Sequence, residues 1–186
     1  MITIIYAHPG DKSFNHAILS AVSDTFAAEG REYRVLDLYA DGFNPAMTET
    51  DLELYSQGKT DDALVKRYSE ALADSDTIVF IFPVWWGMMP AMVKGFFDRV
   101  FLKGTVYDTT DTGDLLPCLS VSRTLIVTTS DGPSVEFGTF FQGYLVPMVF
   151  DSVGMGGAEW YNCERTDYID SDRRTAFIRE IIKHIS

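Results

Sequence analysis

Five short apolar segments alternate with stretches of helical periodicity along this chain. Strands that alternate with helices are typical of an α/β domain with a parallel sheet, because each helix returns the chain to the same edge. A chain of 186 residues is long enough for one such domain, so we expect a single domain over residues 1–186. The expected strands are Ile2–Ala7, Tyr33–Leu38, Thr77–Phe82, Thr124–Thr129 and Ala158–Cys163.

Three stretches between or after these strands repeat apolar residues at helical spacing, which predicts amphipathic helices. The second of them follows Pro90, a residue suited to the first turn of a helix. The predicted inward-facing sets are Phe14, Ile18, Val22 and Phe26, then Val93, Phe96, Phe97, Val100 and Phe101, and last Phe177, Ile178, Ile181, Ile182 and Ile185.

The composition of the strands predicts their order in the sheet. ITIIYA, TIVFIF and TLIVTT are largely apolar and suit central positions, whereas YRVLDL and AEWYNC mix polar and apolar residues as edge strands can. We therefore expect a five-stranded parallel sheet in order 2-1-3-4-5 inside a three-layer sandwich. A six-stranded dinucleotide-binding fold would need another strand and a G-x-G-x-x-G turn, which is absent.

Ligands of open α/β sheets bind at the carboxyl ends of the strands, where the strand order reverses. The predicted order places this point between the first and third strands. Three loops should converge there: His8–Asn15, Pro83–Met89 and Ser130–Gly138.

The first loop, AHPGDKSFN, suits an anion at a helix start. Ser13 and Asn15 can cap a helix or leave N–H groups and hydroxyls for a phosphate, and His8 adds a donor. The loop lacks the Lys-Ser/Thr ending of a nucleoside triphosphate site. The structural alternative is an ordinary capped helix.

The second loop, FPVWWGMMP, places two tryptophans directly after a buried strand. Planar rings and thioethers suit a flat aromatic ligand, and Gly87 permits close backbone approach. The alternatives are a hydrophobic corner or a subunit interface.

The third loop, TTSDGPSVEFG, supplies hydroxyls and backbone N–H groups from Thr128, Thr129 and Ser130, with a turn at Gly132. Such groups can bind the polar edge of a ring cofactor, although the segment is also an ordinary turn. No His, Cys or carboxylate cluster has metal-ligand spacing, so we expect no metal site.

Charge and cysteine content narrow the classes of partner. A net charge of −12 disfavours binding to nucleic acid or acidic membranes.

Cys118 and Cys163 are far apart, which favours reduced thiols in a cytoplasmic protein. The apolar start MITIIYAHPG is short and lacks a basic leader, so it predicts a first strand and neither a signal peptide nor a membrane span.

The segments AHPGDKSFN, FPVWWGMMPAMVKGFFDRVFLKGTVY and TTSDG together resemble the flavodoxin-like NAD(P)H:quinone oxidoreductases, which include bacterial quinone reductases and ancillary subunits of potassium efflux systems. The middle segment is the most specific, and the similarity runs from the first strand to the last helix. The resemblance implies a flavodoxin-like fold, a homodimer, FAD (alternatively FMN) as cofactor, NAD(P)H as co-substrate and a quinone or similar acceptor.

The resemblance also implies roles for individual residues, with Tyr107 often reaching the substrate pocket from the partner subunit. Arg173 or Arg174 falls near the adenosine end of FAD, which together with the first loop favours FAD over FMN. The implied cofactor residues are His8, Ser13, Phe14, Asn15, Pro83, Val84, Trp85, Trp86, Gly87, Thr128, Thr129, Ser130, Asp131, Gly132 and Arg173, and the implied substrate residues are Tyr107, Trp86 and Phe137.

The chain departs from the family pattern after the double threonine. Ser130, Asp131 and Gly132 stand where many relatives have two glycines, and Glu136 and Phe137 occupy the neighbourhood of a Tyr that some relatives pair with a His. The acid–base mechanism of that pair does not carry over, and no catalytic side chain is assigned.

Three functions fit these features. The first is a reductase in which NAD(P)H and the acceptor use one pocket in turn, which gives ping-pong kinetics. The second is a flavodoxin-type electron carrier, whose acidity would attract basic redox partners. The third is a regulatory flavoprotein subunit associated with a membrane ion-efflux system.

Overall fold

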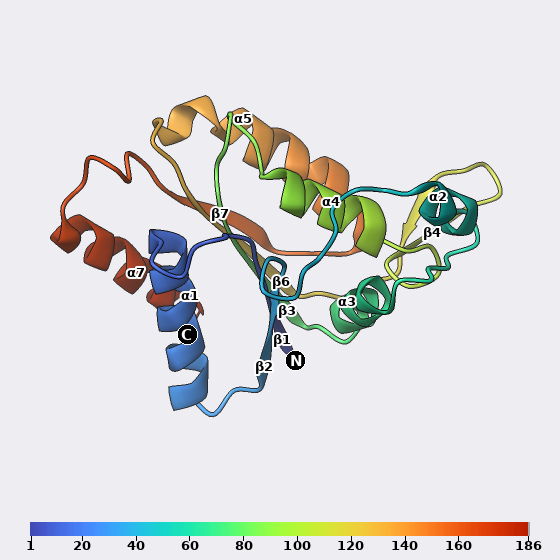
Figure 1. Cartoon of the computed structure of the whole chain (residues 1–186), viewed down its shortest axis with the longest axis horizontal. Coiled ribbons are helices and arrows are strands. Elements are labelled where there is room, and N and C mark those ends of the chain that lie inside the picture. Colours follow the sequence, from blue (N-terminus) through green and yellow to red (C-terminus); the bar gives the residue numbers. More distant parts are fainter. Residues whose placement is uncertain (186) are drawn as a thin grey trace.

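A five-stranded parallel sheet forms the centre of the computed structural model, which describes residues 1–185. The strand order is β2-β1-β3-β6-β7, so the predicted order 2-1-3-4-5 is confirmed (Figure 1). The three apolar segments that the sequence predicts to be central form β1, β3 and β6, which are the three inner strands of the sheet. The strands are β1 (Ile2–Tyr6), β2 (Tyr33–Asp37), β3 (Thr77–Pro83), β6 (Arg123–Thr129) and β7 (Ala158–Cys163).

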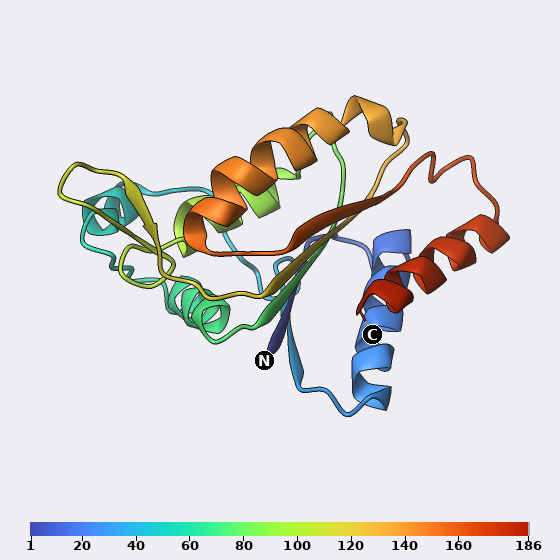
Figure 2. The ribbon, with the colours of Figure 1, turned by 180° about the vertical axis from the view of Figure 1, so that it is seen from behind.

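Helices cover both faces of the sheet and complete the three layers. Helices α1 (Phe14–Ala28) and α7 (Ser171–Ile185) pack together on one face. The other face carries α3 (Ala63–Ala73), α4 (Ala91–Val100) and the π-helix η2 (Phe141–Phe150), as the two opposite views show (Figures 1 and 2). Shorter elements are α2 (Glu49–Tyr55), η1 (Ser134–Glu136), α5 (Gly138–Phe140) and α6 (Asp151–Val153).

Alternating side chains of β3 explain why the sheet has a core on each face. Phe80 and Phe82 pack among the side chains of α3, α4 and η2, whereas Val79 and Ile81 pack against α1 and α7. Burial of each such side chain contributes on the order of 2 kcal/mol before conformational entropy is subtracted. The apolar set predicted for α4 is buried in full.

A small β-hairpin extends the molecule at one end and is absent from the sequence-based prediction. Strands β4 (Tyr107–Thr109) and β5 (Leu115–Pro117) form a separate antiparallel sheet. Both views place the hairpin beside α2, at the end of the molecule opposite α7 (Figures 1 and 2). Leu115 and Leu116 remain exposed there.

A buried ion cluster attaches α2 and α3 to α4. Arg99 donates to the carboxylates of Asp51 and Asp62, each over 3.1 Å, and to the carbonyl oxygen of Asn44 over 2.7 Å. The side chains of Arg99 and Asp51 are only 5% and 7% exposed. A buried guanidinium needs such partners, because an unpaired buried charge is strongly destabilising.

The π-helix η2 exposes part of an apolar surface. It contains Pro147, and its Tyr144 and Met148 are exposed while Phe141 and Leu145 are buried. Within residues 1–185, no helix has both the length and the apolar character needed to cross a membrane.

Candidate functional site

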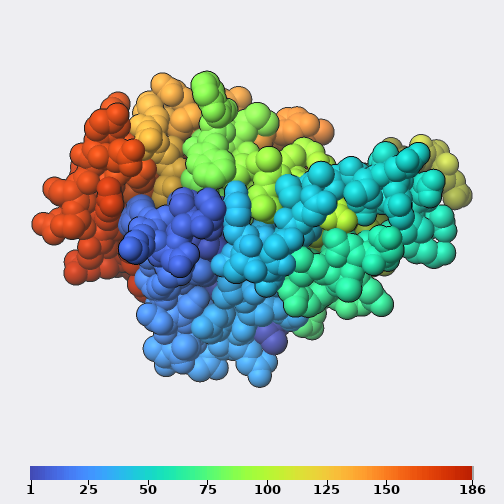
Figure 3. Space-filling view, in the orientation of Figure 1, coloured from blue at the N-terminus to red at the C-terminus, as the bar shows by residue number. Residues whose placement is uncertain are grey.

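A cleft of about 420 Å³ opens at the carboxyl ends of β3 and β6. One wall is the segment that follows β3 and the other is the turn that follows β6. In the space-filling view, the segment after β3 (green) projects beside the segment that leads into η2 (orange; Figure 3). The cleft is lined by Val84, Trp85, Trp86, Gly87, Ser130, Asp131, Gly132 and Phe137, each of which the sequence predicts to contact cofactor or substrate.

The tryptophan wall is a tight two-residue turn. The backbone N–H of Trp85 donates to the carbonyl of Met88 over 3.0 Å, and the reverse bond measures 3.2 Å. Trp86 and Gly87 between them both have positive φ, at 53° and 76°. This conformation suits glycine but strains a tryptophan, whose side chain is also fully exposed. Strain combined with exposure indicates a residue that is held out to contact something else.

The first loop approaches one wall of the cleft through His8, which lies near Trp85. The ring centroids of His8 and Trp85 lie 6.5 Å apart, and the two ring planes are tilted by 60°. The backbone N–H of Gly10 donates to His8 Nδ1 over 3.0 Å, which fixes the orientation of the imidazole. The structure therefore brings the first and second predicted loops together.

The start of α1 joins the first loop to the third. Ser13 is the N-cap, and its hydroxyl accepts from the backbone N–H of His16 over 3.1 Å. Asn15 is buried and donates from Nδ2 to Thr129 Oγ1 over 2.8 Å. Its Oδ1 is buried without a hydrogen-bond partner among the described residues. A buried acceptor left unpaired costs about 1–3 kcal/mol, so this oxygen is suited to a donor from a ligand.

The hydroxyls of the third loop are already engaged within the protein. Thr128 Oγ1 accepts from the Trp160 indole and donates to Asn162 Oδ1, both over 2.8 Å. Ser130 Oγ donates to the carbonyl of Gly132 over 2.8 Å. Within residues 1–185, the backbone N–H groups of Asp131 and Gly132 donate to no group. The turn therefore offers a ligand its backbone N–H groups more readily than its hydroxyls. Asn162, which sequence analysis missed, lies at the centre of this network.

Phe137 packs across the cleft between its two walls. A Cβ placed on Gly132 would lie 2.7 Å from the Phe137 ring and 3.2 Å from Glu136 Oε2, and a Cβ on Gly87 would lie 4.0 Å from the same ring. Phe137 therefore occupies the space that a side chain at position 132 would need, which favours glycine there.

The two arginines near the start of α7 differ in their surroundings. Arg173 is exposed, and its backbone N–H donates to the Asp170 carboxylate over 2.9 Å. Arg174 is half-buried, donates to the carbonyl of Thr166 over 2.6 Å and lies 5.6 Å from the centre of the Phe14 ring. Of the pair that the sequence singles out, Arg174 is the one beside the first loop.

Tyr107 lies in the hairpin and away from the cleft of its own chain. Its ring centroid is 6.5 Å from that of Tyr55 in α2. Burial, followed by hydrogen bonding and charge interaction with Tyr55, raises the pKa of Tyr107. Because β4 and α2 lie at the far end of the molecule from α5 and α7, Tyr107 cannot line this cleft within one chain (Figures 1 and 2).

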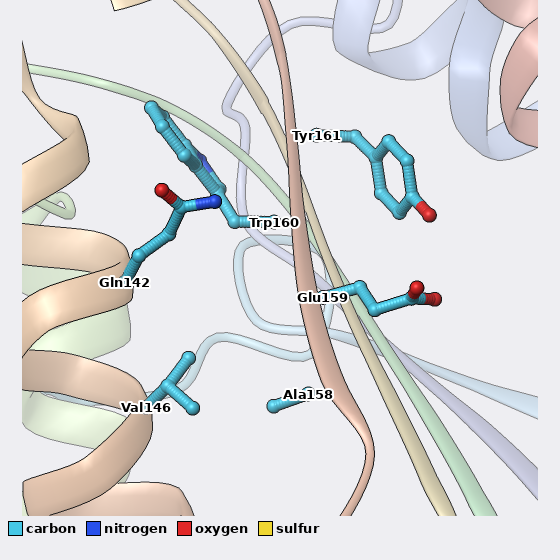
Figure 4. A pocket seen from close by; sticks show the side chains of 6 residues that line it. All are labelled: Gln142, Val146, Ala158, Glu159, Trp160 and Tyr161. Atoms are coloured by element: carbon cyan, nitrogen blue, oxygen red, sulfur yellow. The ribbon is translucent and has the colours of Figure 1, made fainter. Parts of the chain in front are cut away.

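A second hollow, of about 350 Å³, lies beside the edge strand β7. Figure 4 shows Gln142, Val146, Ala158 and Trp160 on one side of the strand, with Glu159 and Tyr161 on the other. It lies beside the strand and does not sit at the carboxyl ends of the sheet, where ligands of this architecture bind.

The described residues contain no group of His, Cys, Asp and Glu side chains that could hold a metal ion. Burial raises the pKa of the Cys163 thiol to about 11, which makes it a poor nucleophile.

The sheet order β2-β1-β3-β6-β7, with helices on both faces, defines an α/β protein of the doubly wound class, and the cleft lies at the carboxyl ends of its strands, next to the reversal between β1 and β3. A family model described as "Flavodoxin-like fold" matches residues 1–185, and the chain belongs to that family.

Named relatives indicate the chemistry found in this family. Over 163 residues the chain is 29% identical to the mouse (Mus musculus) protein named ribosyldihydronicotinamide dehydrogenase [quinone], with 75% of this chain and 71% of that protein covered. Against three other curated relatives, the matched region spans only 53% to 55% of their length.

Two solved structures share the architecture. Smu.1420 from Streptococcus mutans UA159 superposes with a TM-score of 0.82 at 28% identity, covering 98% of this chain and 96% of that one. An FMN-dependent NADH-azoreductase from Bacillus anthracis, solved in complex with FMN, has a TM-score of 0.77 at 18% identity, with 99% and 96% covered. At that identity the second similarity shows the fold alone.

Proposed function

We propose that this protein is a flavin-dependent NAD(P)H:quinone oxidoreductase. The observation that carries the proposal is the composition of the cleft. An exposed, strained Trp86 faces a turn whose Asp131 and Gly132 N–H groups are unpaired within the described residues. One wall suits the face of a flat ring, and the other suits hydrogen-bond acceptors at its edge. The name of the mouse relative, a dehydrogenase that acts with a quinone, supports a quinone as the acceptor.

The residues present fit a flavin. The start of α1, with the unpaired Oδ1 of Asn15, suits the ribityl and phosphate part, and the free N–H groups of the turn suit a ring edge. We favour FAD, with Arg173 or the better placed Arg174 toward the adenosine, and FMN as the alternative. A bound flavin would take a hydride from NAD(P)H and pass two electrons to the acceptor.

The chain's own contribution is to bind, orient and exclude water. Trp85, Trp86 and Phe137 supply apolar surface against which a nicotinamide or a quinone can lie. Both substrates would lie against the same aromatic wall of this cleft, so they use it in turn, which gives ping-pong kinetics. No protein acid or base is assigned to the hydride step.

We infer a homodimer in which Tyr107 of one subunit completes the cleft of the other. The hairpin lies too far from its own cleft for Tyr107 to act there (Figure 1). Exposed Trp85, Trp86 and Met88 also form more apolar loop surface than a monomer ordinarily leaves uncovered. Light scattering at tens of micromolar should give the mass of a dimer.

We also infer a cytoplasmic location, because neither Cys118 nor Cys163 forms a disulfide.

Steady-state kinetics with the purified protein test the proposed activity. NADH or NADPH oxidation that depends on a soluble quinone, with parallel double-reciprocal lines, is expected. Binding of flavin without turnover would favour an electron carrier, and turnover together with co-purification with membranes would favour a subunit of an efflux system. Converging lines would contradict the shared cleft.

A further inference from the structure

Asn162 lies at the end of β7, where its side-chain amide bonds to three hydroxyl groups. Its Oδ1 accepts from Thr128 Oγ1 over 2.8 Å. Its Nδ2 donates to Ser130 Oγ over 2.9 Å and to Ser134 Oγ over 3.0 Å. Both amide protons and the amide oxygen are therefore used, and the three partners lie on both sides of the turn that forms one wall of the cleft.

The bonds run in one direction from the sheet to the cleft. The Trp160 indole can only donate, and it donates to Thr128, whose own proton goes to Asn162. Asn162 then donates to Ser130, whose proton goes to the carbonyl of Gly132. Hydrogen bonds aligned donor to acceptor in this way strengthen one another.

Two backbone-to-backbone hydrogen bonds hold the near end of this turn. Ser130 is anchored by its N–H to Cys163 and by its carbonyl to Thr166, at 2.9 and 3.0 Å. Farther along, the Gly132 carbonyl is held by the Ser130 hydroxyl, and that hydroxyl is held by Asn162. The Asp131 carboxylate also accepts from Thr166 Oγ1 and the Asp167 N–H, and the Ser134 N–H donates to Glu164 Oε2. The Asn162 amide adds a further support through Ser130 and Ser134, so it contributes to the position of the free N–H groups of the turn.

We propose that Asn162 is a positioning residue that presets the turn from Ser130 to Ser134 for the flavin, although it does not itself line the cleft. The inference rests on the proposed function. A preset turn lowers the entropy cost of ordering the binding groups, so its loss should weaken flavin binding. Leucine has similar size but no polar atoms, and alanine at position 130 removes the next link while leaving Asn162 in place.

The test compares Asn162→Leu and Ser130→Ala with Ser75→Ala, a matched control. Ser75 also has a buried hydroxyl, at the amino end of the sheet, whose Oγ lies 2.7 Å from both Thr3 Oγ1 and the Ala71 carbonyl oxygen. Fluorescence quenching gives the Kd for FAD and FMN, thermal melts give the Tm, and hydrogen exchange of the flavin-free protein reports on the amides of Asp131 and Gly132.

Asn162→Leu should raise the flavin Kd by about tenfold, the equivalent of one lost hydrogen bond. It should also speed exchange of the Asp131 and Gly132 amides. Ser130→Ala should do the same, and the double variant should lose little more than either single variant. Ser75→Ala should lower the Tm while its Kd stays within twofold of wild type.

Two results would overturn the inference. A lowered Tm with unchanged Kd and unchanged amide exchange in both Asn162→Leu and Ser130→Ala would reduce Asn162 to a purely structural role. Wild-type protein that binds neither flavin would refute the proposed function, and the positioning role with it, so the two failures are distinguishable. If Asn162→Leu does not fold, Ser130→Ala with its exchange data decides the matter.

Discussion

The side chains of Asn15 and Thr129, 114 positions apart in the sequence, are joined by a 2.8 Å hydrogen bond from Nδ2 to Oγ1. The bond connects the start of α1 to the end of β6. The cleft opens at this edge of the sheet, where the carboxyl ends of the strands lie. The first loop, at the start of α1, and the end of β6 therefore lie side by side.

Asn15→Ala should weaken flavin binding by about 1–3 kcal/mol, because it removes the free Oδ1 and releases Thr129. Isothermal titration of the flavin-free protein measures the change. Thr48→Ala serves as the control, since it removes the N-cap of α2 at a distance from the cleft. The control should lose about 1 kcal/mol of stability with its flavin affinity intact. If Asn15→Ala behaves like the control, Asn15 serves the fold alone.

Trp86→Asn should stabilise the flavin-free protein by about 1 kcal/mol, because asparagine tolerates positive φ and Asn-Gly is a preferred pair in such turns. Flavin or quinone binding should weaken by a similar amount through the lost aromatic surface. Chemical denaturation and steady-state kinetics measure the two effects. A variant that is more stable and retains full activity would show that the strain at Trp86 has no functional purpose.

Gly132→Ala should impair flavin binding, since its Cβ would meet the Phe137 ring at 2.7 Å and displace it into the cleft or push the turn away. Adding Phe137→Leu should restore part of the lost affinity by making room. The Kd values of the single and double variants decide the point, and a double variant no better than Gly132→Ala would locate the clash elsewhere.

The fold was predictable from local pattern because the strands and the major helices carry strong apolar periodicity. The hairpin was missed because β4 and β5 have three residues each and expose Leu115 and Leu116, so no burial pattern marks them. The helix η2 was missed because Gly143 and Pro147 predict a break, whereas its apolar residues pack against the sheet and stabilise it regardless of propensity.

Predictions for the site depended on how each group is paired in three dimensions. Sequence placed the cleft-lining loops correctly at the carboxyl ends of the strands. It could not show that the Thr128 hydroxyl is hydrogen-bonded to Asn162 and the Thr129 hydroxyl to Asn15. Asn162 itself carries no local signal, because its partners lie 28 to 34 residues earlier in the chain.

Acid should destabilise the protein partly through Asp51. Burial raises the pKa of this carboxyl, but hydrogen bonds from Arg99 and Thr48 outweigh it and hold the pKa below the ordinary 3.8. The carboxylate is thus stabilising above pH 3.8, and that contribution is lost as the pH falls through the lowered value. Denaturation of Asp51→Asn as a function of pH should show a weaker loss of stability in acid than wild type.

Removing the Arg99 guanidinium should lower the free energy of unfolding more than removing the Asp51 carboxylate does. Arg99→Met leaves Asp51 charged and buried, which should cost about 3–5 kcal/mol at neutral pH. A loss below about 1 kcal/mol at neutral pH, or identical acid profiles for Asp51→Asn and wild type, would contradict the importance of the pair.

The central claim is tested most directly by an anaerobic titration of the purified protein, followed by its absorption spectrum. Protein supplied with FAD or FMN should bind it at micromolar concentration, lose the visible absorption of the oxidised flavin on addition of NAD(P)H, and recover it when a soluble quinone is added. Failure to bind either flavin, or a bound flavin that NAD(P)H does not bleach, would contradict the account.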